Sequence, residues 1–156
     1  MHRWGLRQVV LLFWAAYFAV VGLTNILDLL HGLGLLPAGW RYLAGNLPLM
    51  IRLFAGVGLP AGAAGAALAG VVLWEGAAAW LFWRTLRRDE PPERACALGA
   101  GLWAAFLVAD ELLLSYSLEA VHLRLFTAQL LSWLVLRQTA WHDPPVIRKP
   151  PHPRGM

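Results

Sequence analysis

Four apolar runs, each about as long as a membrane-crossing helix, constrain this chain more than any other feature of its sequence. The hydrocarbon layer of a bilayer is about 30 Å thick and takes roughly 20 helical residues to cross. The runs cover residues 8–30, 61–83, 95–117 and 118–137. Each must be helical in lipid, because an isolated segment there satisfies its backbone hydrogen bonds only internally. The sequence therefore predicts an all-α fold, an up-down bundle of four transmembrane helices.

The composition agrees with a membrane protein. Hydrophobic residues make up 59% of the chain and charged residues 14%, whereas a soluble domain is about one quarter charged. The length of 156 residues suits one domain of a few spans. A single cysteine, Cys96, excludes an internal disulfide and a cysteine-based metal cluster. Arginine is much commoner than lysine, which fits a bacterial source with a GC-rich genome.

The boundary between the third and fourth runs is marked only by polar residues. No Gly or Pro interrupts residues 103–138. One unbroken helix over 95–137 would be about 64 Å long, which is too long for a single crossing. We therefore expect a turn near the polar triplet Ser115, Tyr116 and Ser117, where Ser117 can cap a new helix.

Basic residues gather at what would be one side of the bundle. They precede the first span, fill the loop after the second and follow the fourth: Arg3, Arg7, Arg84, Arg87, Arg88, Arg94, Arg137, Arg148, Lys149 and Arg154. Because positively charged loops stay in the cytoplasm, the sequence predicts a multi-pass protein of a bacterial inner (cytoplasmic) membrane, with both termini cytoplasmic. This clustering accounts for the pI near 10.0, so the basic charge does not indicate nucleic-acid binding. The expected partner is the lipid bilayer.

Two segments lie outside the spans. The long outer loop covers residues 32–60, and its apolar stretch, 40–54, predicts either a short helix in the outer interface or a cap on the bundle, with Pro48 as an interruption. The predicted transmembrane domain is residues 1–141. The tail, 142–156, is Pro-rich and basic, so we expect it to be extended or disordered and to contact anionic lipid.

Small residues recur at intervals of four in the second run. They form two series, Gly62, Ala66 and Gly70, and Ala61, Gly65 and Ala69. Small residues at this spacing let two helices approach closely. We expect the series to serve packing within the bundle, with dimerisation of two chains as the alternative.

Polar side chains inside the apolar runs are the strongest functional signal. An ionised group at the centre of a membrane helix costs about 2.5 to 3.5 kcal/mol, so their presence indicates a role. Five of the nine carboxylates and two histidines lie in or beside the runs: Asp28, Glu75, Asp110, Glu111, Glu119, His31 and His122. In an up-down bundle they fall in the outer third, except that Glu75 lies nearer the middle.

Two carboxylate-x-x-histidine pairs suggest a metal site. Asp28 with His31, and Glu119 with His122, each share one helix face. Dinuclear iron bundles use such a pair on each of two helices plus one Glu from each of the other two. Iron, manganese or zinc suits these ligands, and histidine also suits haem. The candidate metal or polar cluster is Asp28, His31, Glu75, Glu111, Glu119 and His122, supported by Asn25, Asp110 and Arg124.

The same acids have a simpler interpretation. They are uncharged, or they pair with arginines such as Arg52 and Arg124 and with one another, and so lock the helices together.

A further set of residues carries a family resemblance. Asn25 and Asp28 close the first span, and Trp74 and Glu75 are adjacent within the second. The third and fourth spans add Asp110-Glu111-Leu112, Tyr116, Glu119, His122, Phe126 and Gln129. This set resembles an uncharacterised class of small four-span bacterial integral membrane proteins. The resemblance implies the four-span topology and a polar cluster, and it implies no activity. The outer loop departs from the pattern of that class.

Three functions remain open. The chain is an accessory membrane subunit or binding module, whose polar cluster fixes the bundle or docks another membrane subunit. Alternatively it holds a metal ion or haem and has redox activity, or it translocates protons or ions along its acids. Conduction needs acids through the full thickness, and the inner half has only Glu75. Whether the chain is an enzyme stays open, and no catalytic residue is identified, since no nucleophile elbow accompanies Ser115 or Ser117.

Overall fold

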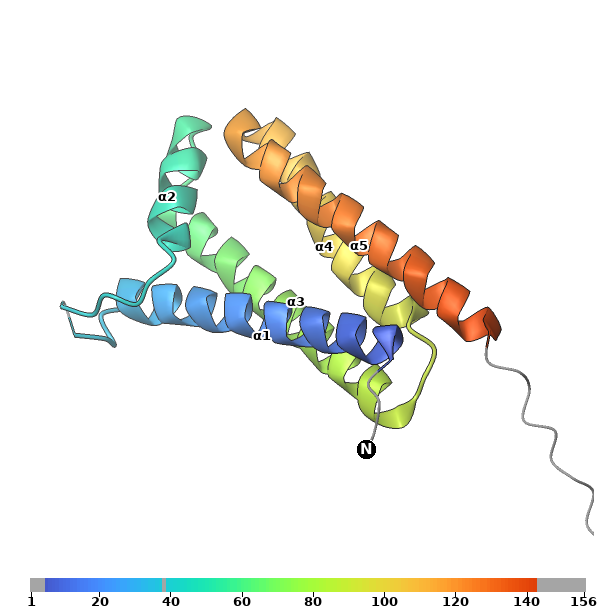
Figure 1. Cartoon of the computed structure of the whole chain (residues 1–156). Helices are drawn as coiled ribbons and strands as arrows, with labels where there is room; N and C mark the ends of the chain where they lie inside the picture. The colour runs from blue at the N-terminus through green and yellow to red at the C-terminus, as the bar shows by residue number, and fades with distance from the viewer. Residues whose placement is uncertain (1–4, 38, 143–156) are drawn as a thin grey trace, which may run out of the picture.

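Figure 1 shows a computed structural model of the chain, which describes residues 5–37 and 39–142, the last four of them by backbone alone. This part of the chain is all-α, as predicted. Five helices follow one another: α1 (Leu6–Gly32), α2 (Asn46–Gly56), α3 (Ala61–Arg88), α4 (Glu93–Leu112) and α5 (Tyr116–His142). The predicted Pro-rich tail lies outside the described residues beyond His142.

Three of these helices, α1, α3 and α4, are long and apolar enough to cross a membrane. They coincide with the first three predicted spans and expose many large apolar side chains, which is compatible with contact to lipid. Within the described residues α5 is not among these helices. With 27 residues it is long enough, but Glu119, His122, Arg124 and Gln129 make it more polar than the others. The prediction of four spans is therefore confirmed for three.

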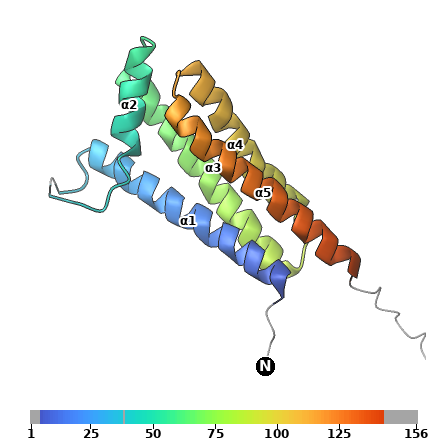
Figure 2. The same ribbon diagram turned by 45° about the horizontal axis from the view of Figure 1, so that its top comes forward.

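The helices run up and down, with each of the long helices antiparallel to the next (Figures 1 and 2). The start of α1, the connection from α3 to α4 and the end of α5 lie together, and we name this the terminal end of the molecule. The opposite end holds α2 and the turn between α4 and α5, and we name it the α2 end (Figure 2). The closest helix pairs are α1 with α3 and α4 with α5.

Arginines and acids tie the helices at the terminal end. Arg7 Nη1 lies 2.6 Å from Asp89 Oδ1, and Arg7 Nη2 donates to the carbonyl of Glu90 at 2.8 Å. Arg84 pairs with the Glu90 carboxylate at 2.9 Å. Three guanidinium groups also lie over tryptophan rings: Arg84 over Trp80, Arg87 over Trp83 and Arg137 over Trp133. The predicted clustering of basic residues thus corresponds to one end of the described bundle.

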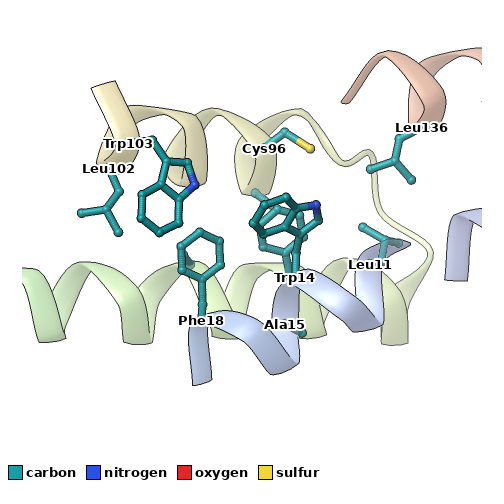
Figure 3. Close-up of a cluster of buried hydrophobic side chains, with 11 residues drawn as sticks. Leu11, Trp14, Ala15, Phe18, Cys96, Leu102, Trp103 and Leu136 are labelled. Carbon is teal, nitrogen blue, oxygen red and sulfur yellow. The ribbon is translucent and has the colours of Figure 1, made fainter. Parts of the chain in front are cut away.

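Stacked aromatic rings form the core between α1, α3 and α4. The Phe18 ring stacks on Phe82 at 6.0 Å and on Trp103 at 5.6 Å between centroids. Figure 3 shows Phe18 rising from α1 toward Trp103 on α4. Trp14 Nε1 donates to Ser132 Oγ at 2.9 Å, so the core also reaches α5. This apolar core occupies the half of the bundle nearer the terminal end.

The predicted turn between the last two helices is present, with a shift in position. α4 ends at Leu112, and Leu114 adopts a left-handed conformation with φ 52°. The Ser115 carbonyl accepts the first hydrogen bonds of α5, from the amides of Leu118 and Glu119. Ser115 thus precedes the helix, and the prediction that Ser117 caps it is wrong. Ser117 lies inside α5 because the turn needs only the residues from 113 to 115.

The outer loop contains α2, as the prediction of a short helix or cap required. Pro48 does not interrupt this helix, since it lies in the first turn, where a missing amide costs no helical hydrogen bond. α2 contacts α3 and α1 rather than lying free.

The glycines of the predicted series on α3 do not form close helix contacts. Among the described residues, nothing lies within 4 Å of a Cβ placed at Gly62, Gly65 or Gly70. Close approaches occur instead at Gly99 and Gly101 on α4, where a Cβ would meet Gln129 and Trp74. Packing of the predicted series within the bundle is therefore wrong for its glycines, because α3 turns other faces toward its neighbours.

Candidate functional site

Glu75 is the most deeply buried acid of the described chain. It lies midway along α3, on the face that also buries Leu68 and Phe82, and is 1% exposed. The Asn25 Nδ2 atom on α1 donates to both carboxylate oxygens, at 3.0 and 2.9 Å. Gly22, about one turn before Asn25, packs next to the Glu75 side chain, since a Cβ there would lie in ordinary contact with Glu75 Cβ at 3.5 Å. The carboxyl group therefore links two of the helices that are long and apolar enough to cross a membrane.

Asp28 caps α2 from a different helix. The residue before α2 is Gly45, with φ 78°, and it has no side chain to accept from the first amides. Asp28 Oδ2 on α1 accepts from the amides of Asn46 and Leu47 at 2.5 and 3.3 Å, and Oδ1 accepts from Ala44 at 3.0 Å. A carboxylate at a helix N-terminus satisfies free amides and complements the helix dipole. Asp28 therefore fixes the start of α2 on the end of α1.

Asn46 links these two sites. Its Nδ2 atom donates to Asn25 Oδ1 at 2.6 Å, while Asn25 Nδ2 holds Glu75. We name Asn25, Asp28, Asn46 and Glu75 the polar network. It joins α1, α2 and α3 through side chains that are all buried or half-buried, where a lost hydrogen bond leaves a polar group without a partner.

A second buried acid, Asp110, holds a histidine. Asp110 lies in the last turn of α4 and is 4% exposed. Its Oδ2 atom is 2.5 Å from Nδ1 of His122 on α5. The imidazole ring stacks on Phe106, with centroids 4.7 Å apart. When the Asp110 carboxylate is ionised it only accepts, so Nδ1 then donates and Nε2 is the nitrogen left for another partner.

The polar network and the Asp110–His122 pair border one cleft. It has a volume of about 850 Å³, is partly open and lies where α2 and the α4–α5 pair diverge (Figure 1). The polar network contributes Asn25, Asn46 and Glu75, and the other wall contributes Asp110 and His122. Most of the remaining lining is apolar or aromatic and comes from all five helices, including Leu49, Met50, Leu53, Phe54, Leu118 and Leu125. Ligand sites in proteins have this size and this mixture of groups.

Three buried polar atoms lack a protein partner among the described residues. They are Trp103 Nε1 and both amide atoms of Gln129. Gln129 on α5 is 0% exposed and lies against Gly99 of α4. Trp103 also lines the cleft. Such atoms are uncommon in folded proteins, since a buried amide without a partner is destabilising.

The structure separates the residues of the predicted metal cluster. Asp28 and Glu75 belong to the polar network, and His122 pairs with Asp110. The side chains of His31, Glu111, Glu119 and Arg124 have no hydrogen bond or ion pair among the described residues, and Glu111 and Arg124 are exposed. No group of three or more His, Cys, Asp or Glu side chains in this part of the chain is placed to hold a metal ion. The dinuclear arrangement therefore lacks its ligand set.

The sequence analysis missed one member of the polar network, Asn46. Asn46 lies in the predicted outer loop. A polar residue in a loop is not expected to be buried, so its residue type alone does not mark it as part of a site. Its position directly after Gly45 and two residues before Pro48 is a helix start signal that marks it. The pairing of Asp110 with His122 was also missed, because they lie twelve residues apart on two helices.

Comparison with known protein families, curated proteins and solved structures finds no match to this chain. Its function is therefore argued from the geometry above.

Proposed function

We propose that the chain is a small integral membrane binding module or accessory subunit, in which the polar network holds three helices around the cleft. One observation carries this proposal: Asp28, Asn46, Asn25 and Glu75 form a continuous series of hydrogen bonds across α1, α2 and α3, and that series borders the cleft. Hydrogen bonds buried away from water define one arrangement of helices, since breaking any of them exposes a polar group to apolar surroundings. A fixed arrangement keeps the cleft ready for a ligand or a partner subunit.

The proposed setting is a bacterial inner membrane, with α5 as the fourth span. The arginines of the terminal end support cytoplasmic placement of both termini, because positive residues concentrate on that side. The polar network then lies toward the non-cytoplasmic surface. α5 supports this topology by its length of 27 residues and by its antiparallel packing on α4.

Replacement of Asn25 by Ala tests the proposal. The variant leaves the buried Glu75 carboxyl group without its donor, so we expect a loss of stability of about 1 to 3 kcal/mol. We also expect less ligand or partner protein to co-purify from native membranes, measured by mass spectrometry of lipids and proteins. Glu111→Gln is the matched control, because Glu111 is exposed, and it should behave as wild type. Equal stability and equal co-purification in both variants would remove the support for this function.

A haem or metal role is a second candidate, favoured by His122 alone. Asp110 fixes Nδ1 of this ring, as carboxylates do for metal-bound histidines, and the ring borders a cleft. The visible spectrum and metal content of protein purified from native membranes test this role. A haem absorption band or bound metal that is lost in His122→Ala would favour it over the first proposal.

Proton translocation has less support. Between the polar network and the terminal end, the buried side chains include the apolar cluster of Leu11, Trp14, Phe18, Ala78 and Phe82. A proton path through this half of the bundle needs polar groups or water, which such side chains exclude.

A further inference from the structure

The acidic side chains that border the cleft are not balanced by lysine or arginine among the described residues there. The titratable lining residues of the cleft are Tyr17, Glu75, Asp110 and His122, and the described lining contains no Lys or Arg. The only hydrogen bonds to the Glu75 carboxyl group within the described residues come from the neutral amide of Asn25, and none of the ion pairs there includes Glu75. Asp110 has His122 as its partner. An ionised Glu75 is thus a buried negative charge without a countercharge.

Aromatic side chains border the same cleft. Tyr17, Trp74, Trp103 and Phe106 contribute to its lining. Two of these rings are held in place. Trp74 Nε1 donates to the carbonyl of Leu98 at 2.9 Å, and Trp103 stacks on Phe18. The negative face of an aromatic ring attracts organic cations, most strongly where water is excluded.

The rest of the lining selects against a small hydrated ion. The apolar side chains of α2 and α5 that line the cleft offer no oxygen atoms, whereas inorganic cations need several oxygen or nitrogen ligands. An amphiphile that enters from the bilayer leaves its apolar part against these side chains. Glu75 is 1% exposed and belongs to the lining of the cleft. In these apolar surroundings the attraction between an ionised Glu75 carboxylate and a cation is screened less than in water.

We propose that this cleft binds a lipophilic organic cation, with its charge beside Glu75 and the aromatic rings and its apolar substituents against α2 and α5. The ligand class is an amine or quaternary onium ion with large apolar groups. This inference deepens the proposed binding role and rests on it.

The experiment compares two ions of nearly equal size and opposite charge, tetraphenylphosphonium and tetraphenylborate. Binding of each to the full chain in a neutral detergent is measured by isothermal titration calorimetry. We expect the cation to bind at least about tenfold more tightly than the anion. This comparison uses the wild-type protein and depends on no variant. Equal affinities, or tighter binding of the anion, overturn the inference.

Three variants locate the charge. Glu75→Gln keeps the shape of the side chain and one of its two hydrogen bonds from Asn25. It should weaken binding of the phosphonium ion by about tenfold while leaving the borate unchanged. Glu75→Asp keeps the charge and should bind more tightly than Glu75→Gln. Glu111→Gln, an exposed control, should match wild type within about twofold. A folded Glu75→Gln variant with wild-type affinity for the cation overturns the role of Glu75.

The outcome also separates this inference from the proposed function. If neither ion binds, but a neutral lipid or a protein subunit co-purifies and is lost in Asn25→Ala, the binding module stands and the cationic ligand is wrong. If neither ion binds and nothing co-purifies, both are wrong.

Discussion

At the scale of single residues, Asp28 shows how a side chain of one helix caps the start of another. It lies in the last two turns of α1 and accepts from three backbone amides at the start of α2. Gly45 gives the chain the left-handed conformation that lets it turn into α2, and in doing so it leaves the cap to another residue. A helix that depends on a distant acceptor is sensitive to the loss of that acceptor.

We predict that Asp28→Ala lowers the free energy of unfolding by about 1 to 2 kcal/mol, the usual effect of removing an N-terminal cap. Thermal unfolding in detergent measures the loss, and hydrogen exchange should show faster exchange at the amides of Asn46 and Leu47. Glu119→Ala is the control, because this part-exposed carboxylate has no hydrogen bond or ion pair within residues 5–37 and 39–142. It should change stability by less than about 0.5 kcal/mol. Similar effects of both substitutions would show that Asp28 is not the cap.

The sequence identified Asp28 and Glu75 as residues with a role, but it assigned them the wrong partners. Spacing along one helix places Asp28 and His31 on one face, and it carries no information on the backbone amides that the outer loop brings to Asp28. The partner of Glu75 is Asn25, which was a supporting residue of the predicted cluster. Burial in apolar runs thus marked the important acids, whereas their contacts depend on how the helices are arranged.

At the scale of elements, the close approach of α4 and α5 depends on Gly99. A Cβ at this position would lie 2.8 Å from Gln129 Oε1 and 3.2 Å from the Phe18 ring. Both neighbours are 0% exposed, so a Cβ at this position must displace buried side chains. The contact therefore sets how deeply the Gln129 side chain inserts between the helices.

We predict that Gly99→Ala destabilises the protein by about 1 to 3 kcal/mol through overpacking. Gly70→Ala is the matched control, since nothing described lies within 4 Å of its Cβ, and it should be neutral or stabilise by up to about 1 kcal/mol through helix propensity. Thermal unfolding of both variants in one detergent makes the comparison. Gln129→Ala should reduce the cost of Gly99→Ala, and purely additive effects would show that the two side chains do not compete for space.

The elements were predicted with differing success, for physical reasons. The lengths of the apolar runs gave α1, α3 and α4 to within a few residues, apart from the late end expected for the third run. The turn before α5 was expected because an unbroken helix is too long to cross a bilayer once. Close helix contacts were predicted at the wrong glycines. The sequence shows where small residues lie on a helix, but it does not show which neighbouring helix faces them.

At the scale of the whole molecule, the terminal end and the α2 end differ: arginine contacts gather at the first, and the cleft lies toward the second. Arginine pairs with acids and with tryptophan rings occur at the terminal end, and the cleft lies toward the α2 end. Such a division fits a protein that meets the cytoplasm with one end and takes a ligand or partner from the other.

We predict that an impermeant thiol reagent labels Ser117→Cys in intact spheroplasts, and labels Pro91→Cys only after the membrane is opened. Both positions are exposed, at opposite ends of the bundle. The native Cys96 is buried, so the wild-type chain provides the background. Labelling of Pro91→Cys in intact spheroplasts would reverse the proposed orientation.

The cleft itself was beyond prediction from the sequence. It exists because α2 diverges from the α4–α5 pair, and that divergence depends on crossing angles and on the anchor of α2 at Asp28. The sequence supplies the apolar and aromatic residues that line the cleft, but the same residues in a tighter bundle would fill a closed core.

The anchoring of α2 has a consequence for synthesis of the chain. A helix of 11 residues is too short to persist on its own, yet its anchors, Asn25 and Asp28, leave the ribosome before it does. α2 can therefore form as soon as the first span is inserted, whereas Glu75 arrives later, with the next span. We expect the nascent protein to fold its outer segment first and to complete the lining of the cleft only afterwards, so that the binding site matures from the surface inward.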